Sequence, residues 1–121
     1  MRYDDLLNVP YKHGGRGKDG FDCYGLVMEC CRRNGTPLRD FFKDIESLDA
    51  DDVEGYVRRG LNVRKTDAPR PGCVVEMEYH GKAHVGFLAE RGVIVHATLD
   101  RGVRTTHPAC AKITAYYEVT R

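Results

Sequence analysis

Hydrophobic positions in the first third of this chain recur at the spacing of an amphipathic helix. They follow the glycine-bearing loop "HGGRGKDG", and they are Cys23, Leu26, Val27 and Cys30. Asp22 is a favourable N-cap immediately before them, and Gly35 can end the helix. The stretch "DADDVEGYVRRG" at 49–60 predicts a second, shorter helix, because its acidic residues come first and its arginines last.

After "APRPG" the pattern changes to short segments rich in β-branched and aromatic residues. Turn signals such as "HGK" and "ERG" separate several of them. The segments are "CVVEMEY", "AHVGFLA", "VIVHATL", "GVRTT" and "ITAYYEV". Short strands spaced this closely favour an antiparallel sheet. The sequence therefore predicts an α+β fold, in which N-terminal helices pack on one face of a C-terminal antiparallel β-sheet.

Composition narrows the classes of function. The chain has 121 residues, which predicts a single domain over 1–121. The formal net charge is +1 with both signs well mixed, which argues against nucleic acid or a membrane surface as partner. No apolar run approaches the roughly 18 residues of a membrane span. The first residues, "MRYDDLLNVPYK", lack the features of a signal peptide, so we expect synthesis in the cytoplasm.

Five cysteines with no regular spacing argue against a disulfide framework and favour reduced thiols. Cys23 would begin the predicted helix, where free N–H groups and the helix dipole favour a thiolate. A thiolate is the form that attacks, and the flanking glycines would let a substrate backbone approach it. The alternative is a small buried hydrophobic residue, which is how we interpret the others: Cys30, Cys31, Cys73 and Cys110.

Two histidines could serve a cysteine nucleophile. His84 lies in "KAHVGFLA" and His96 in "VIVHATL", 12 residues apart with the turn signal "ERG" between them. An antiparallel hairpin of that length can place both side chains on one face, where one acts as base and the other holds its ring. Each histidine alone fits an ordinary partly buried position in a sheet. Their combination with Cys23 favours the catalytic interpretation.

A metal site is not expected. His80 and His84 are four residues apart, but "HGKAH" contains a turn signal rather than a helical pattern. Together with Cys73 and His96, they lack any recognised zinc spacing. We therefore expect neither a metal ion nor another cofactor.

The blocks "PYKHGG", "GFDCYGLV", "RPGCVV", "HVGFLA" and "VIVHAT" together resemble the NlpC-type cell-wall cysteine peptidases in order and spacing. The resemblance runs from about Tyr11 to Thr106, and it implies a papain-like fold. It also implies that Cys23 is the nucleophile, His84 the general base and His96 the residue that orients His84.

The same resemblance implies a substrate. The family typically hydrolyses the bond between D-glutamate and a diamino acid in peptidoglycan stem peptides. Tyr11 matches a tyrosine that lines the site, and Asp22 matches an acid that helps to receive the free amino end of the stem. This chain has Tyr24 where the family usually has serine, and His13 where it often has tryptophan. Tyr24 becomes a further candidate for substrate binding.

An aromatic residue after the cysteine, here Tyr24, resembles a subgroup found in bacteriophage tail-assembly proteins. We therefore expect peptidoglycan stem peptides as substrate, phage tail proteins as partners, and assembly into a phage tail or virion. One alternative is a cytosolic thiol amidase or acyltransferase acting on another small amide. Another is a non-enzymatic tail-assembly module, although the intact set Cys23, His84 and His96 argues against it.

Overall fold

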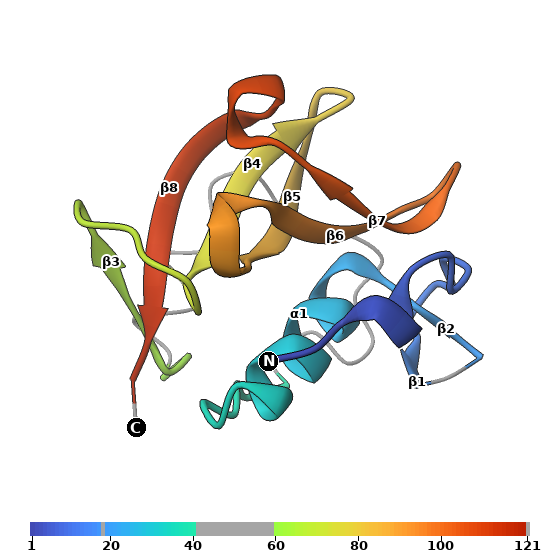
Figure 1. Cartoon of the computed structure of the whole chain (residues 1–121), viewed down its shortest axis with the longest axis horizontal. Coiled ribbons are helices and arrows are strands. Elements are labelled where there is room, and N and C mark those ends of the chain that lie inside the picture. The colour runs from blue at the N-terminus through green and yellow to red at the C-terminus, as the bar shows by residue number, and fades with distance from the viewer. Residues whose placement is uncertain (18, 41–59, 121) are drawn as a thin grey trace.

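In the described part of the chain, a helix packs against a curled, antiparallel six-stranded sheet (Figure 1). The computed structural model describes residues 1–17, 19–40 and 60–120. Its helices and strands, with short 3₁₀ turns marked η, are η1 (Asp4–Leu6), β1 (Arg16–Gly17), β2 (Gly20–Phe21), α1 (Cys23–Arg33), β3 (Val63–Thr66), β4 (Val74–Tyr79), β5 (Lys82–Leu88), η2 (Glu90–Gly92), β6 (Ile94–Thr98), β7 (Gly102–Thr106), η3 (Pro108–Cys110) and β8 (Lys112–Val119).

The sheet has the strand order β3-β8-β4-β5-β6-β7, and every neighbouring pair is antiparallel. Helix α1 packs on β5 and β6, where the main hydrophobic core forms around residues such as Leu26, Phe87 and Val95. A second, smaller core that includes Val75 and Ile94 is separate from it. All five residues of β6 are buried, which explains its nearly continuous apolar sequence.

The predicted α+β architecture is confirmed, and all five predicted strand segments form strands β4 to β8. The sequence did not predict edge strand β3, because only Val63 of its residues "VRKT" is buried and no alternation is visible. The short hairpin of β1 and β2 before α1 was also not predicted. The second predicted helix, at 49–60, falls almost entirely outside the described residues.

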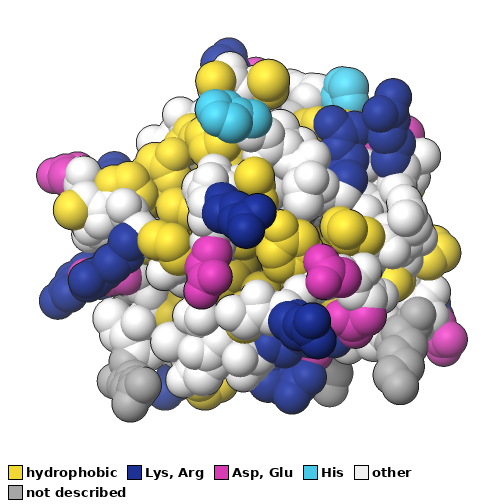
Figure 2. All heavy atoms as spheres, viewed as in Figure 1, with side chains coloured by type: hydrophobic (Ala, Val, Ile, Leu, Met, Phe, Trp, Pro, Cys, Tyr) yellow, Lys and Arg dark blue, Asp and Glu magenta, His cyan; other side chains and the backbone are white. Residues whose placement is uncertain are grey.

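The surface agrees with the balanced composition. On the face shown in Figure 2, basic and acidic side chains are interspersed among apolar atoms. Among the described residues, no helix is both long and apolar enough to span a bilayer.

Candidate active site

Helix α1 begins at Cys23, as predicted, and Asp22 is its N-cap. The Asp22 backbone is extended, and its carboxylate accepts a hydrogen bond of 2.6 Å from the N–H of Gly25. This bond satisfies one of the N–H groups that a helix start leaves free, and it fixes the first turn. Cys23 is consequently held at the end of a rigid element, with its side chain half-buried.

Glycines around Cys23 allow backbone segments to pack closely. A Cβ atom on Gly25 would lie 2.1 Å from the carbonyl oxygen of Gly15, and one on Gly15 would lie 2.4 Å from the carbonyl oxygen of Gly20. Neither position has room for a side chain. Gly15 therefore packs the loop onto α1, a role that the sequence pattern did not predict, while the approach of a substrate along this loop stays a prediction.

Asp22 and Tyr24 lie beside the nucleophile but point into the protein. Asp22 is 5% exposed and forms an ion pair of 2.7 Å with Arg16, which also pairs with Asp40 at 3.0 Å. Tyr24 is 4% exposed; its hydroxyl donates to the Arg39 carbonyl, and its ring lies 5.8 Å from the Arg16 guanidinium carbon. Neither lines the cavity described next, so contact with a substrate stays a prediction for both.

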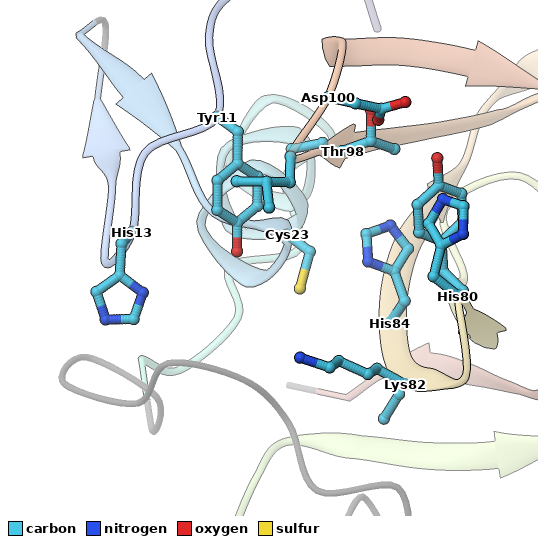
Figure 3. A pocket seen from close by; sticks show the side chains of 12 residues that line it. Tyr11, His13, Cys23, His80, Lys82, His84, Thr98 and Asp100 are labelled. Atoms are coloured by element: carbon cyan, nitrogen blue, oxygen red, sulfur yellow. The ribbon is translucent and has the colours of Figure 1, made fainter.

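A cavity of about 530 Å³ opens in front of Cys23 (Figure 3). Its walls include Tyr11 and Cys23 from the N-terminal part and Tyr79 and His84 from the sheet. Figure 3 shows the His84 ring turned toward the Cys23 side chain, with the Tyr11 hydroxyl on the other side of the sulfur. Three of the six predicted site residues, Tyr11, Cys23 and His84, thus line one cavity. A fourth, His96, is hydrogen-bonded to His84.

The two predicted histidines are in contact across β5 and β6. Nε2 of His84 lies 2.9 Å from Nδ1 of His96, and Nε2 of His96 lies 2.7 Å from Oγ1 of Thr106 on β7. Gly86 allows β5 and β6 to pack closely, because a Cβ atom there would lie 2.6 Å from Cγ2 of Ile94 and 3.2 Å from Cβ of His96. A chain of hydrogen bonds therefore runs from the cavity through three neighbouring strands.

Both rings are neutral at physiological pH. Burial lowers the pKa of His84 to about 3, with further lowering from His96 and His80. Burial also lowers the pKa of His96 to about 4, and Arg104 adds to the effect. A neutral imidazole carries one N–H, so each ring must donate with one nitrogen and accept with the other.

Two tautomer arrangements fit the hydrogen-bond chain, because the Thr106 hydroxyl can accept or donate, and one of them leaves His84 ready to act as a base. If His96 donates from Nε2 to Thr106, its Nδ1 must accept from Nε2–H of His84. Nδ1 of His84 is then an unprotonated acceptor on the cavity side. Thr106 accepts from His96 in this arrangement, and it can fill that role because a hydroxyl both accepts and donates. The geometry is consistent with His84 acting as a base through Nδ1.

Tyr79 fixes the orientation of the same ring. It stacks on His84 with ring centroids 5.0 Å apart and an interplanar angle of 30°, and it meets the edge of His96 at 5.8 Å and 81°. Stacking and edge-to-face contacts of this kind are favourable aromatic arrangements. His84 is thus restrained by a hydrogen bond at one nitrogen and by a ring on one face.

Cys23 is a neutral thiol in the resting protein. Burial raises the pKa of its thiol to about 11, although hydrogen bonds from the backbone N–H groups of Val85, Tyr24 and Cys23 itself lower it. We expected the helix start to favour the thiolate; burial outweighs that effect here. Proton removal from Cys23 therefore has to accompany attack on a substrate.

Among residues 1–17, 19–40 and 60–120, no three His, Cys, Asp or Glu side chains are grouped closely enough to hold a metal ion.

The sequence singled out neither Thr106 nor Tyr79. Thr106 ends strand β7 and Tyr79 ends β4, so both reach the histidines only through sheet register. Their position at strand ends beside a predicted catalytic hairpin was the one available signal.

The hydrogen-bond chain makes a testable prediction for Thr106. Thr106→Val keeps the side-chain shape but removes the acceptor for His96, so kcat should fall by about tenfold with little change in KM. Thr106→Ser should restore most of the loss. Steady-state kinetics check this, with Thr105→Val as the matched control, because Thr105 is exposed on the same strand.

The hydrogen bonds of His96 also predict which of two His96 variants keeps more activity. His96→Asn keeps a side chain that can hydrogen-bond to His84 and should retain more activity than His96→Ala. If Thr106→Val and His96→Ala both turned over substrate like the wild type, the orienting role of His96 would be wrong.

Two comparisons with known proteins find similar domains. A model of the NlpC/P60 family matches residues 8–120. Among solved structures, the chain is similar to the "Crystal structure of NlpC/p60 domain of peptidoglycan hydrolase SagA", with a TM-score of 0.60 and 16% sequence identity over 96% of this chain and 90% of that chain. The second likeness concerns the fold and confirms the predicted papain-like architecture. A search of curated proteins finds no matching sequence.

Proposed function

The chain belongs to the NlpC/P60 family, and on this premise we propose that it is a peptidoglycan hydrolase that cleaves an amide bond of stem peptides with Cys23 as nucleophile. One observation carries the proposal: His84 shares a cavity with Cys23, and its far nitrogen is hydrogen-bonded to His96. The structurally similar protein named above is itself called a peptidoglycan hydrolase, which supports the same class of substrate.

The first chemical step forms a thioester. Nδ1 of His84 takes the proton of the Cys23 thiol while the sulfur attacks the amide carbon. The carbonyl oxygen becomes an oxyanion, and the new imidazolium is stabilised by its hydrogen bond to His96. His84 then gives the proton to the amide nitrogen, the C–N bond breaks, and the amine leaves.

The second step consumes water. His84 removes a proton from a water molecule, and the resulting oxygen attacks the thioester carbon. The carbon–sulfur bond breaks, the Cys23 sulfur recovers the proton from His84, and the carboxylic acid product leaves. The two steps together add one water molecule across the amide bond and return the protein to its starting state.

The oxyanion needs hydrogen-bond donors aimed at its developing charge. The backbone N–H of Cys23 is one candidate, because it belongs to the helix start. The hydroxyl of Tyr11 is a second, since it lines the cavity and its pKa is raised to about 12, mainly by burial, so it stays a donor. Tyr11 is therefore proposed to line the substrate site and to stabilise the oxyanion.

We assign the bond between D-glutamate and the diamino acid as the one cleaved. Synthetic stem peptides that contain this bond test the assignment. Mass spectrometry should find two products whose masses sum to the substrate plus one water, and the Cys23→Ala variant should yield none. Cleavage of a different amide in the same peptide would correct the bond. An intact peptide after prolonged incubation with folded protein would count against the function.

We further propose that the chain acts as part of a bacteriophage tail. The support is Tyr24, an aromatic residue directly after the nucleophile, which resembles the tail-assembly subgroup. Mass spectrometry of purified virions from a phage that encodes the chain should detect its peptides in proportion to tail proteins. Virions that lack those peptides would contradict the assignment to a tail, while leaving the hydrolase proposal intact.

A further inference from the structure

Lys82 is a charged residue of the cavity wall that has no role in the mechanism proposed above. It is the first residue of β5, two positions before His84, so both side chains project from the same face of the strand. Lys82 is exposed and lines the same cavity as Cys23. Figure 3 shows its ammonium group reaching into the space in front of the Cys23 sulfur.

The charge of Lys82 has no ion-pair partner among the described residues. In the part of the chain that the structure describes, no salt bridge involves this side chain, whereas Lys112 pairs with Glu78 at 3.2 Å. The other charged residue of the wall, Asp100, is hydrogen-bonded by Thr98 and lies 3.9 Å from Arg101. In Figure 3, Asp100 lies on the opposite side of the cavity from Lys82.

Burial favours the uncharged forms of two groups on the same wall, the Cys23 thiol and the His84 imidazole, by raising the pKa of the first and lowering the pKa of the second. Cys23 is a thiol, and His84 is a neutral imidazole whose far nitrogen is bonded to His96. Among the described residues that line the cavity, Lys82 is therefore the one lysine or arginine that an incoming anion meets. A cation on the wall of a partly enclosed cavity attracts a group of opposite charge and raises its local concentration.

We propose that Lys82 forms an anion subsite of the cavity and binds a carboxylate of the substrate beside the amide bond that Cys23 attacks. The substrate class is thus a peptide with a free carboxylate next to the scissile amide, rather than one in which that carboxylate is amidated. The choice of peptide rests on the proposed function, but the subsite itself can be tested without it.

Two small alkylating agents test the subsite independently of peptidase activity. Iodoacetate is an anion and iodoacetamide is its neutral counterpart, and both react with the thiolate of Cys23. Any change in the pKa of the thiol cancels in the ratio of their two rates. Cys110→Ser serves as the background, because Cys110 is exposed, and site-resolved mass spectrometry reports alkylation at Cys23.

Lys82→Met should lower the ratio of iodoacetate to iodoacetamide rates by about three- to tenfold at low salt. The difference should shrink in high salt, because salt screens the interaction. Lys65→Met is the matched control: it removes the same charge from edge strand β3, which β8 and β4 separate from β5, and should leave the ratio unchanged. An unchanged ratio in Lys82→Met, or an equal fall in both variants, would overturn the subsite.

Matched stem peptides test the substrate class. One carries a free carboxylate beside the scissile amide and the other carries the amide of that carboxylate. The ratio of their kcat/KM values should favour the free carboxylate and fall at least about fivefold in Lys82→Met. An unchanged ratio would contradict the proposed substrate class. If the wild type cleaved neither peptide, the hydrolase proposal would fail, and the alkylation ratio would still decide whether Lys82 forms an anion subsite.

Discussion

Replacing Cys23 by alanine should reduce the rate of stem-peptide hydrolysis by on the order of 10⁴-fold or more, while the protein stays folded. The loss is this large because no other group of the described cavity wall can form the thioester. The change should cost little stability, about 1 kcal/mol or less, because Cys23 is half-buried at the cavity wall rather than enclosed in the core. Initial rates and thermal unfolding measure the two effects separately.

The other cysteines supply the matched controls. Cys30 is fully buried on α1, and Cys73 is 2% exposed within the second core. Cys30→Ala and Cys73→Ala should lower the free energy of unfolding by roughly 1–2 kcal/mol and leave the rate of the folded protein near that of the wild type. A Cys23→Ala protein as active as the wild type would remove the basis of the proposed chemistry.

Replacing His84 by alanine should remove nearly all turnover at neutral pH, on the order of 10³-fold or more. The cause is the high pKa of the nucleophile: burial raises the pKa of the Cys23 thiol to about 11, so little thiolate is present at neutral pH. Without the imidazole, attack depends on the small fraction of thiolate. Residual activity of His84→Ala should therefore rise with pH across the whole alkaline range.

The wild type should show a different pH profile. His84 works as a base only when it is neutral, and its pKa lies near 3, well below the ordinary value for histidine. Activity is consequently retained as pH falls through 6.5 and is lost only at more acidic pH, when the ring gains a proton. The pH dependence of kcat/KM tests both profiles, with His107→Ala as control because His107 is exposed outside the cavity. Wild-type rates in His84→Ala at neutral pH would contradict the assigned base.

The sequence was sufficient to predict the elements that hold the reacting groups. Asp22 and the apolar spacing after it predicted where α1 begins, and the turn between two β-rich segments predicted a hairpin that joins His84 to His96. These features are local, since each depends on residues close together in the chain. The pattern of short strands likewise predicted the sheet, except for edge strand β3.

The features of the site that the sequence did not predict depend on sheet register and burial. Thr106 meets His96 only because β7 pairs with β6, and Tyr79 meets His84 only because β4 pairs with β5. The contacts of Asp22 also could not be predicted, because its carboxylate pairs with Arg16 and accepts from Gly25 only in the folded protein. The pKa of the Cys23 thiol could not be predicted either, since burial outweighs the effect of the helix start.

The central claim is that this chain hydrolyses peptidoglycan stem peptides through the thiol of Cys23. Mass spectrometry of muropeptides tests it most directly, after isolated peptidoglycan has been incubated with the wild type and, in parallel, with folded Cys23→Ala protein. We predict that the wild type converts stem peptides to pairs of fragments that together gain one water, and that the variant leaves the muropeptide profile unchanged. Uncut muropeptides with the folded wild-type protein, or equal cleavage by both proteins, would contradict the claim.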